Sequence, residues 1–174
     1  MKEEVWRILF MGTSPFAVPS LKILLEKKEN IIGVFTQPDR PQGRGLKIRI
    51  SPVKTLTMEN EIPLFQPEKI NREESIEIIK KLSPDLIVVA AFGQIIPQRI
   101  LDIPKFGSIN VHASLLPKYR GAAPINWAII QGEKETGVTT MLMDRGLDTG
   151  DILLQRKAGR MWHLKKRFLQ SIRA

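Results

Sequence analysis

The run PDLIVVAA at Pro84–Ala91 is the feature that most constrains what this chain can fold into. Its apolar residues follow one another without alternation, which is typical of a strand that is covered on both faces. The segments at Val5–Met11 and Asn30–Thr36 also have the composition of strands. Strands covered on both faces belong to parallel sheets, whose crossover helices provide the covering. The sequence therefore predicts an α/β fold.

Segments with helical spacing stand between these predicted strands. Ser14 and Pro15 supply an N-cap and a first-turn proline for the first helix, and Ser51 and Pro52 start another. The remaining predicted elements are a strand at 62–65, a helix at 72–82, a helix at 124–131, and strands at 136–143 and 151–155. This alternation predicts a Rossmann-like fold, with a mostly parallel sheet and helices on both faces. Because Gly12 stands without a G-x-G-x-x-G pattern, a dinucleotide cofactor is poorly supported.

The composition excludes several classes of protein. The chain has 174 residues, no cysteine and two distant histidines, which argues against disulfides, thiolate catalysis and a zinc site. There is no apolar run near the length of a membrane span, and the N-terminus lacks the apolar region of a signal peptide. We therefore expect a cytoplasmic protein with no metal and no membrane partner.

The net charge of +9 is unevenly distributed along the chain. Seven of the 27 basic residues lie from Arg156 onward, where there is no acidic residue, so positions 1–155 hold 20 basic and 18 acidic residues. The main body is close to neutral, and the net charge alone does not predict a nucleic-acid partner.

The string GSINVHASLLPKYRG at Gly107–Gly121 carries the first candidate site. Asn110 and His112 are two residues apart in a predicted strand, so their side chains point to the same face, about 6.5–7 Å apart. The chain then enters a loop, and strand ends that open into loops are where α/β proteins place their chemistry. Taken alone, the pair fits a structural role better than a catalytic one.

A second string, DRGLDTGDIL at Asp144–Leu153, places Asp148 in a loop flanked by glycines. Together, Asn-x-His, SLLPKYRG and LDTGD resemble the 10-formyltetrahydrofolate-dependent formyltransferases. The strings RGAAPI at Arg120–Ile125 and QPDRPQGRG at Gln37–Gly45 resemble the branch that formylates methionyl-tRNA. The resemblance runs from Arg7 to about Gln155.

The resemblance implies the formyltransferase fold and the transfer of a formyl group from 10-formyltetrahydrofolate to the amino group of initiator methionyl-tRNA. It implies Asn110 and His112 as donors to the oxygen on which negative charge develops, with Asp148 orienting the imidazole and helping to move the amine proton. It also implies a folate site, formed by Phe92, Gly93, Gln94, Ile95, Ile96, Ser114, Leu115, Leu116, Pro117 and Asp144.

The segment Gln37–Ile50 is basic and rich in turn residues, and its prolines and glycines argue against regular structure. Its charge alone fits a solvated surface loop. The resemblance instead implies a loop that contacts the tRNA acceptor end, mainly through Arg44, with Arg40 and Lys47 in support.

The resemblance fails after Gln155, so we expect a catalytic core at 1–155 and a divergent basic tail at 156–174, without the C-terminal β-barrel of the family. The tail is either a frameshift product or a basic amphipathic helix with its apolar residues between Trp162 and Ile172. Apolar sheet left uncovered there would favour self-association.

Two other functions stay open at the level of the sequence. One is an enzyme of the glycinamide ribonucleotide formyltransferase kind, acting on a small amine, against which RGAAPI and QPDRPQGRG argue. The other is a catalytically inactive fragment that binds folate or RNA.

Overall fold

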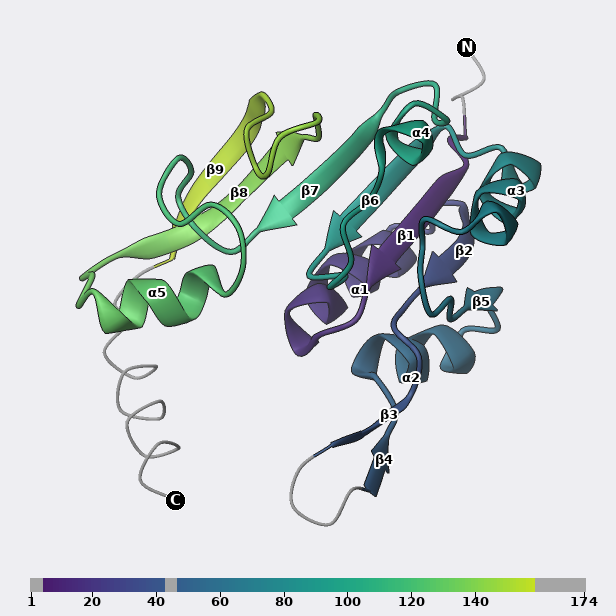
Figure 1. Ribbon diagram of the computed structural model, residues 1–174, viewed down its shortest axis with the longest axis horizontal. Helices are drawn as coiled ribbons and strands as arrows, with labels where there is room; N and C mark the ends of the chain where they lie inside the picture. The colour runs from purple at the N-terminus through teal and green to yellow at the C-terminus, as the bar shows by residue number, and fades with distance from the viewer. Residues whose placement is uncertain (1–4, 43–46, 159–174) are drawn as a thin grey trace. The chain divides into compact units, whose positions relative to one another are not determined.

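The computed structural model describes residues 5–42 and 47–158. The chain divides into two compact units, Met1–Ile109 and Asn110–Ala174. Its strands form a seven-stranded sheet in the order β5-β2-β1-β6-β7-β8-β9 and a separate two-stranded sheet, β3-β4 (Figure 1). The predicted α/β fold with a mostly parallel sheet is confirmed.

Four parallel strands form the centre of the first unit. They are β1 (Ile8–Gly12), β2 (Ile31–Phe35), β5 (Leu64–Phe65) and β6 (Leu86–Ala90). Strand β1 pairs with β2 on one side and β6 on the other, and β2 pairs with β5. Every residue of β1 is buried. The three apolar segments are therefore covered strands, as predicted, although β1 begins only at Ile8, where its pairing with β2 and β6 starts, and Val5 and Trp6 before it are exposed.

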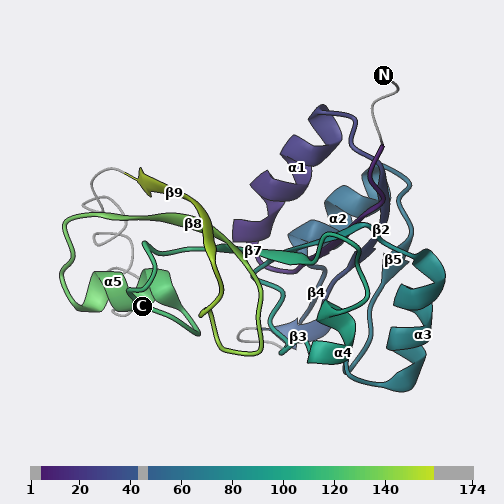
Figure 2. The same cartoon turned by 90° about the horizontal axis from the view of Figure 1, so that it is seen from above.

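Helices cover both faces of this part of the sheet. The first connection contains a 3-10 turn, η1 (Pro15–Ala17), followed by α1 (Val18–Glu26), and the later helices are α2 (Pro52–Glu59), α3 (Glu73–Leu82) and α4 (Gln98–Leu101). Helices α1 and α2 lie on one face, and α3 and α4 lie on the other (Figure 2). The connection from β5 to β6 runs back across the sheet, so a right-handed crossover places α3 opposite α1 and α2.

The structure confirms a side-chain cap at one of the two predicted N-cap residues and not at the other. Ser51 Oγ accepts the backbone N–H of Lys54 at 3.0 Å, as expected of an N-cap. Ser14 precedes a 3-10 turn and makes no capping bond through its side chain, so that part of the prediction was wrong. Its backbone carbonyl accepts from the N–H of Ala17 at 2.9 Å, which closes the turn without the hydroxyl.

The basic segment Gln37–Ile50 contains regular structure, which corrects the prediction. Strands β3 (Arg40–Gln42) and β4 (Lys47–Arg49) form an antiparallel hairpin in which Pro41 lies opposite Ile48. Proline is tolerated here because each strand has a free edge, so no second ladder needs its missing N–H.

The second unit begins inside β7 (Ser108–His112) and contains α5 (Pro124–Ile130), β8 (Thr136–Leu142) and β9 (Ile152–Ala158). Strands β8 and β9 are antiparallel, and Thr136 lies opposite Ala158. Strand β9 thus continues past Gln155, where the resemblance ends. The predicted helix between Trp162 and Ile172 lies outside the described residues.

All of β9 is exposed, including the apolar residues Ile152, Leu153 and Leu154. This observation is compatible with the self-association considered above, which stays a prediction. None of the helices in residues 5–42 and 47–158 is long and apolar enough to span a membrane.

Candidate active site

Strand β7 brings the first two candidate catalytic residues to its carboxyl end. Asn110 and His112 are separated by one residue, as the alternation of a strand requires for side chains on the same face. Only 6% of His112 is exposed, although it lies where the chain leaves the sheet. The site is therefore built on a rigid element, from which the chain continues into the loop that starts at Ala113.

Asp148 joins these two side chains, although it is far from them in the sequence. Its Oδ1 accepts a hydrogen bond from Nδ2 of Asn110 at 3.0 Å, and its Oδ2 lies 3.4 Å from Nδ1 of His112. Oδ2 also accepts the backbone N–H of Gly121 at 2.8 Å. The side chains of His112 and Asp148 are only 7% and 10% exposed. The structure thus brings together all three residues that the resemblance implied.

The backbone at Asp148 has a φ of 53°, in the left-handed region. Aspartate and asparagine enter this region more readily than other non-glycine residues. The conformation lets the carboxylate face Asn110 and His112 while the Asp148 carbonyl accepts from Nε of Arg120 at 2.8 Å. Side chain and backbone of the same residue therefore hold two parts of the site.

The second ring nitrogen of His112 is also in contact. Nε2 lies 2.8 Å from the backbone carbonyl oxygen of Tyr119. Because a carbonyl oxygen only accepts, Nε2 carries a proton in this arrangement. A proton on Nδ1 as well lets the imidazolium donate to both Tyr119 and the Asp148 carboxylate. The imidazole is thus fixed in orientation from both sides.

A buried hydroxyl supports the loop that follows β7. Thr139, which has no exposed surface, donates to the carbonyl of Ser114 at 2.7 Å and accepts the N–H of Leu116 at 3.1 Å. Gln155 adds hydrogen bonds to the Leu116 carbonyl and to the Thr139 hydroxyl, at 2.7 and 3.0 Å. Strands β8 and β9 therefore set the shape of the Ser114–Pro117 segment.

Glu133 anchors the next part of this loop. Its Oε1 accepts from the Tyr119 hydroxyl at 2.8 Å and from Nζ of Lys118 at 3.0 Å. The Lys118 ammonium, and next the Tyr119 hydroxyl, lower the pKa of the Glu133 carboxyl. Tyr119 also packs against the small core of Ala128 and Ile129 on α5. The carbonyl that faces His112 is thus held by its own residue's side chain.

Some residues of the site could not be recognised by their side chains. Tyr119 and Gly121 contribute a carbonyl and an N–H, which any residue offers, and Gly121 has a φ of 85° that favours glycine. Both residues lie in the string SLLPKYRG, and the family resemblance of that string was the only feature of the sequence that pointed to them.

The residues predicted to bind folate are distributed over both units. In the first unit, Phe92 and Ile96 are buried, whereas Ile95 is 86% exposed. The Gln94 side chain accepts the N–H of Ile70 at 2.7 Å and donates to the Pro67 carbonyl at 3.1 Å. Gln94 therefore fixes its own loop, which leaves backbone groups and apolar walls for a ligand.

In the second unit, Asp144 has a local role. Its Oδ1 accepts from the N–H of Gly146 at 2.9 Å and from the hydroxyl of Thr149 at 2.7 Å. These bonds close the turn that leads to Asp148. A contact between Asp144 and folate stays a prediction.

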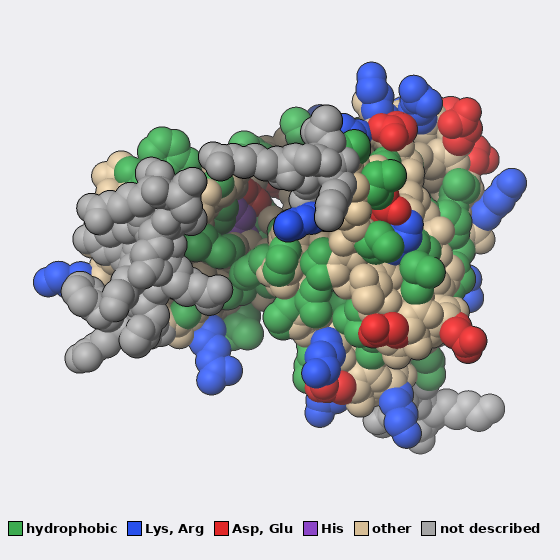
Figure 3. All heavy atoms as spheres, turned by 90° about the horizontal axis from the view of Figure 1, so that it is seen from below, with side chains coloured by type: hydrophobic (Ala, Val, Ile, Leu, Met, Phe, Trp, Pro, Cys, Tyr) green, Lys and Arg blue, Asp and Glu red, His purple; other side chains and the backbone are tan. Residues whose placement is uncertain are grey.

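Arg40, one of the three predicted tRNA contacts, is paired with an acidic side chain. It lies on β3, and its Nη2 is 2.8 Å from Oε2 of Glu68, with both side chains more than half exposed. Lys47 begins β4, and Arg44 lies outside the described residues. Lys and Arg side chains are dispersed among acidic and apolar ones on the face shown in Figure 3.

Among residues 5–42 and 47–158, no group of histidine, aspartate or glutamate side chains is arranged to hold a metal ion. The candidate site consists of the Asn110 amide, the His112 imidazole and the Asp148 carboxylate.

Comparison with known proteins agrees with this description. A family model described as formyl transferase matches residues 6–161. The chain belongs to the formyl transferase family. It is 62% identical over 150 residues to the methionyl-tRNA formyltransferase of Geobacter sulfurreducens, a match covering 86% of this chain and 47% of that protein. The enzyme of the same name from Clostridioides difficile is 62% identical over 149 residues, with 86% and 48% covered.

This formyl transferase chain therefore spans about half the length of the curated relatives it matches. Among solved structures, it is similar to the phosphoribosylglycinamide formyltransferase of Streptococcus pneumoniae, with a TM-score of 0.74 and 19% identity, covering 95% of this chain and 92% of that one. The glycinamide ribonucleotide transformylase 1 of Geobacillus kaustophilus gives a TM-score of 0.71 at 23% identity, with 95% and 92% covered. At this identity the likeness concerns the fold.

Proposed function

We propose that this chain is the catalytic part of a cytoplasmic methionyl-tRNA formyltransferase, which transfers a formyl group to the amino group of initiator methionyl-tRNA. One observation carries the proposal: a single carboxylate, that of Asp148, contacts both Asn110 and His112 at the end of a strand. The identity of about 62% to enzymes of this name supports the tRNA branch over the small-amine branch.

In this reaction the amine attacks the formyl carbon, a new C–N bond forms, and the bond from that carbon to the donor nitrogen breaks. The formyl oxygen gains negative charge as the amine attacks, and fixed donors aimed at it supply the largest stabilisation. Nδ2 of Asn110 has two N–H groups, of which one is given to Asp148. The second N–H is the proposed donor to this oxygen.

His112 contributes a second group with a fixed direction. Its ring is held between the Tyr119 carbonyl and the Asp148 carboxylate, so little reorientation is needed during the reaction. In its protonated form both ring N–H groups are engaged by Tyr119 and Asp148, so the protonated ring would stabilise the developing oxyanion through its nearby positive charge. Proton transfer from the attacking amine to the leaving nitrogen completes the exchange, with Asp148 helping to move the proton through water.

10-Formyltetrahydrofolate supplies the formyl group on a nitrogen that is ready to leave. The residues proposed to hold it include the apolar side chains of Phe92, Ile96 and Leu116, each of which is buried. The Gln94 and Ser114 side chains are satisfied within the protein, Ser114 by donating to the Lys118 carbonyl at 2.6 Å. Backbone groups of Phe92–Ile96 and Ser114–Pro117 therefore make the proposed polar contacts.

The proposal is tested by measuring formylation of charged initiator tRNA and of glycinamide ribonucleotide, each with and without 10-formyltetrahydrofolate. The chain is compared with a version extended to the length of its relatives, because the match covers about half of them. We expect folate-dependent formylation of the tRNA by the extended chain. Formylation of glycinamide ribonucleotide alone would establish the small-amine branch, and folate or RNA binding without turnover in either assay would establish an inactive fragment.

A further inference from the structure

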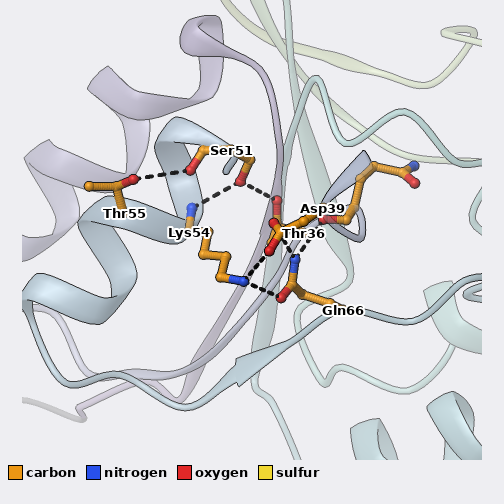
Figure 4. A network of polar contacts seen from close by, with 7 residues as sticks. Thr36, Asp39, Ser51, Lys54, Thr55 and Gln66 are labelled. Carbon is orange, nitrogen blue, oxygen red and sulfur yellow. Dashed lines mark hydrogen bonds and ion pairs between the residues drawn. The ribbon is translucent and has the colours of Figure 1, made fainter. Parts of the chain in front are cut away.

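The β3–β4 hairpin is connected to the rest of the first unit by two short segments, and a polar network ties these segments together. The incoming segment follows β2 and contains Thr36 and Asp39, whereas the outgoing segment leads into α2 through Ser51 and Lys54. Figure 4 shows these residues converging, together with Gln66 from the segment after β5.

Lys54 lies at the centre of this network. Its Nζ donates to Oδ2 of Asp39, and to Oε1 of Gln66 at 2.9 Å. Nε2 of Gln66 donates in turn to Oδ1 of Asp39 at 3.1 Å and to the Gln37 carbonyl at 3.0 Å. The side chains of Lys54, Asp39 and Gln66 thus form a closed ring of hydrogen bonds, which joins the incoming and outgoing segments to the segment after β5.

A second tie lies deeper in the same place. The hydroxyls of Thr36 and Ser51 are 2.9 Å apart, and Thr36 has no exposed surface. The Thr13 hydroxyl accepts the N–H of Gln37 at 3.1 Å and donates to the Phe92 carbonyl at 2.8 Å. The base of the hairpin is therefore attached to the carboxyl ends of β1 and β6.

Outside this base, the described part of the hairpin is tied to the rest of the unit by the exposed ion pair of Arg40 with Glu68. Within the described residues, β3 and β4 pair only with each other. Two-stranded hairpins are marginally stable in water without further packing. Ile48 on β4 and Ile50 just after it are exposed, so neither side chain is inserted into the core. Its direction is therefore set at its base.

We propose that Lys54, Asp39 and Gln66 are positioning residues for nucleic-acid binding by this hairpin. The inference rests on the proposed function, since it takes the partner to be the phosphate backbone of tRNA. Lys54 itself is not a phosphate contact, because its side chain is only 17% exposed and its ammonium is engaged by Asp39 and Gln66. Arg40, by contrast, is 59% exposed and its only acidic partner within the described residues is the exposed Glu68.

The charges of Lys54 and Asp39 matter to the proposed positioning of the hairpin. Removing either partner leaves the other charge with reduced access to water, and this costs more than the loss of an exposed ion pair. Substitutions that keep the shape of the side chain, Lys54→Met and Asp39→Asn, therefore loosen the base of the hairpin without creating a cavity. Lys54→Arg keeps a donor for both partners.

The experiment uses these three variants with Arg99→Met as a matched control. Arg99 also makes an ion pair, with Glu73 at 2.8 Å, but this pair is at least half exposed and Arg99 lies on α4 rather than at the base of the hairpin. Hydrogen exchange is measured at the backbone amides of β3 and β4. Steady-state kinetics are measured with charged initiator tRNA in the chain extended to the length of its relatives.

We expect faster exchange in β3 and β4 for Lys54→Met and Asp39→Asn, and a rise of KM for tRNA of about tenfold with kcat little changed. The fall of tRNA affinity with salt keeps its slope, because no phosphate contact has been removed, whereas Arg44→Ala makes that slope shallower. Lys54→Arg restores most of both properties, and Arg99→Met changes neither.

Unchanged exchange in both Lys54→Met and Asp39→Asn would overturn the proposal, and so would faster exchange with an unchanged KM. If Arg44→Ala leaves the tRNA reaction and its salt dependence unaltered, the tRNA contact that the resemblance implies for this segment falls, and the inference falls with it. The exchange data separate that failure from a hairpin that is held elsewhere.

Discussion

Replacement of Asp148 by asparagine tests the core of the proposed site most directly. Asparagine has nearly the same shape and is also tolerated at a φ of 53°, so the loop keeps its backbone conformation. Alanine at this position would add backbone strain to the loss of the carboxylate. The asparagine variant therefore isolates the chemistry of the carboxylate.

The expected magnitude follows from the three groups that face this carboxylate. Asn110 donates at 3.0 Å, Gly121 donates at 2.8 Å, and Nδ1 of His112 lies at 3.4 Å. An asparagine side chain has one oxygen and one NH2 group, so it accepts from one side only and presents donors to the other. At least one of these groups is then left without an acceptor, and the imidazole loses its charged partner.

Loss of an oriented donor or of a proton-transfer group typically reduces turnover by about 10² to 10⁴. We expect Asp148→Asn to lower kcat for formylation of charged initiator tRNA by about 10³, in the middle of that range. Because the carboxylate lies at the reacting end of the site, folate binding changes far less. The same logic applies to Asn110→Ala and His112→Ala, with losses of about 10² or more.

The assay is single-turnover formyl transfer by the chain extended to the length of its relatives, together with a folate-binding titration and a thermal unfolding curve. Asp151→Asn is the matched control, since this exposed aspartate belongs to the same loop. Turnover within a few-fold of the parent, with an intact fold, would refute the role given to Asp148.

Two further predictions concern stability. Thr139→Val keeps the volume of a fully buried side chain but leaves the Leu116 N–H and the Ser114 carbonyl without their partner. We expect the free energy of unfolding, measured in urea, to fall by about 1–3 kcal/mol. Thr140→Val, on the other face of β8, should be nearly neutral, and equal effects of the two substitutions would refute this reading. The hydrogen bond from Lys54 lowers the pKa of Asp39. The pair therefore contributes stability above about pH 4, the usual pKa of aspartate, and this stability is lost as the pH falls through the lowered pKa. The difference in unfolding free energy between the parent and Lys54→Met should shrink in acid, and a constant difference from about pH 6 to about pH 3 would contradict this prediction.

The central sheet was predictable because its signal is compositional. A strand covered on both faces has no need for polar residues, so Leu86–Ala90 stands out in the sequence without reference to any other segment. The position of Asn110 and His112 was predictable for a similar reason, since the period of a strand fixes which side chains share a face. Both predictions depend on local geometry alone.

The hairpin and the capping of the first helix were not predictable by the same rules. Proline and glycine weaken strands that pair on both sides, but β3 and β4 pair only with each other among the described residues, so Pro41 meets no missing partner. Lys54 shows a related limit: its sequence context is that of any helical lysine, and only the placement of Asp39 and Gln66 reveals that its charge is engaged. Counting basic residues near the hairpin therefore overstates the number available to a phosphate.

The contacts of Asp148 also narrow its role in the proposed mechanism. The two carboxylate oxygens already face Asn110, His112 and the Gly121 N–H, and the side chain is 10% exposed. Few lone pairs remain for a proton from the amine, so orientation of the amide and the imidazole is the larger contribution expected of this residue. Gly121 makes that orientation dependent on the loop after β7, since its N–H reaches Asp148 from a backbone with a φ of 85°. We propose that the functional unit is three side chains together with the turn at Tyr119–Gly121, and substitution of Gly121 by a residue with a side chain should disturb catalysis through Asp148.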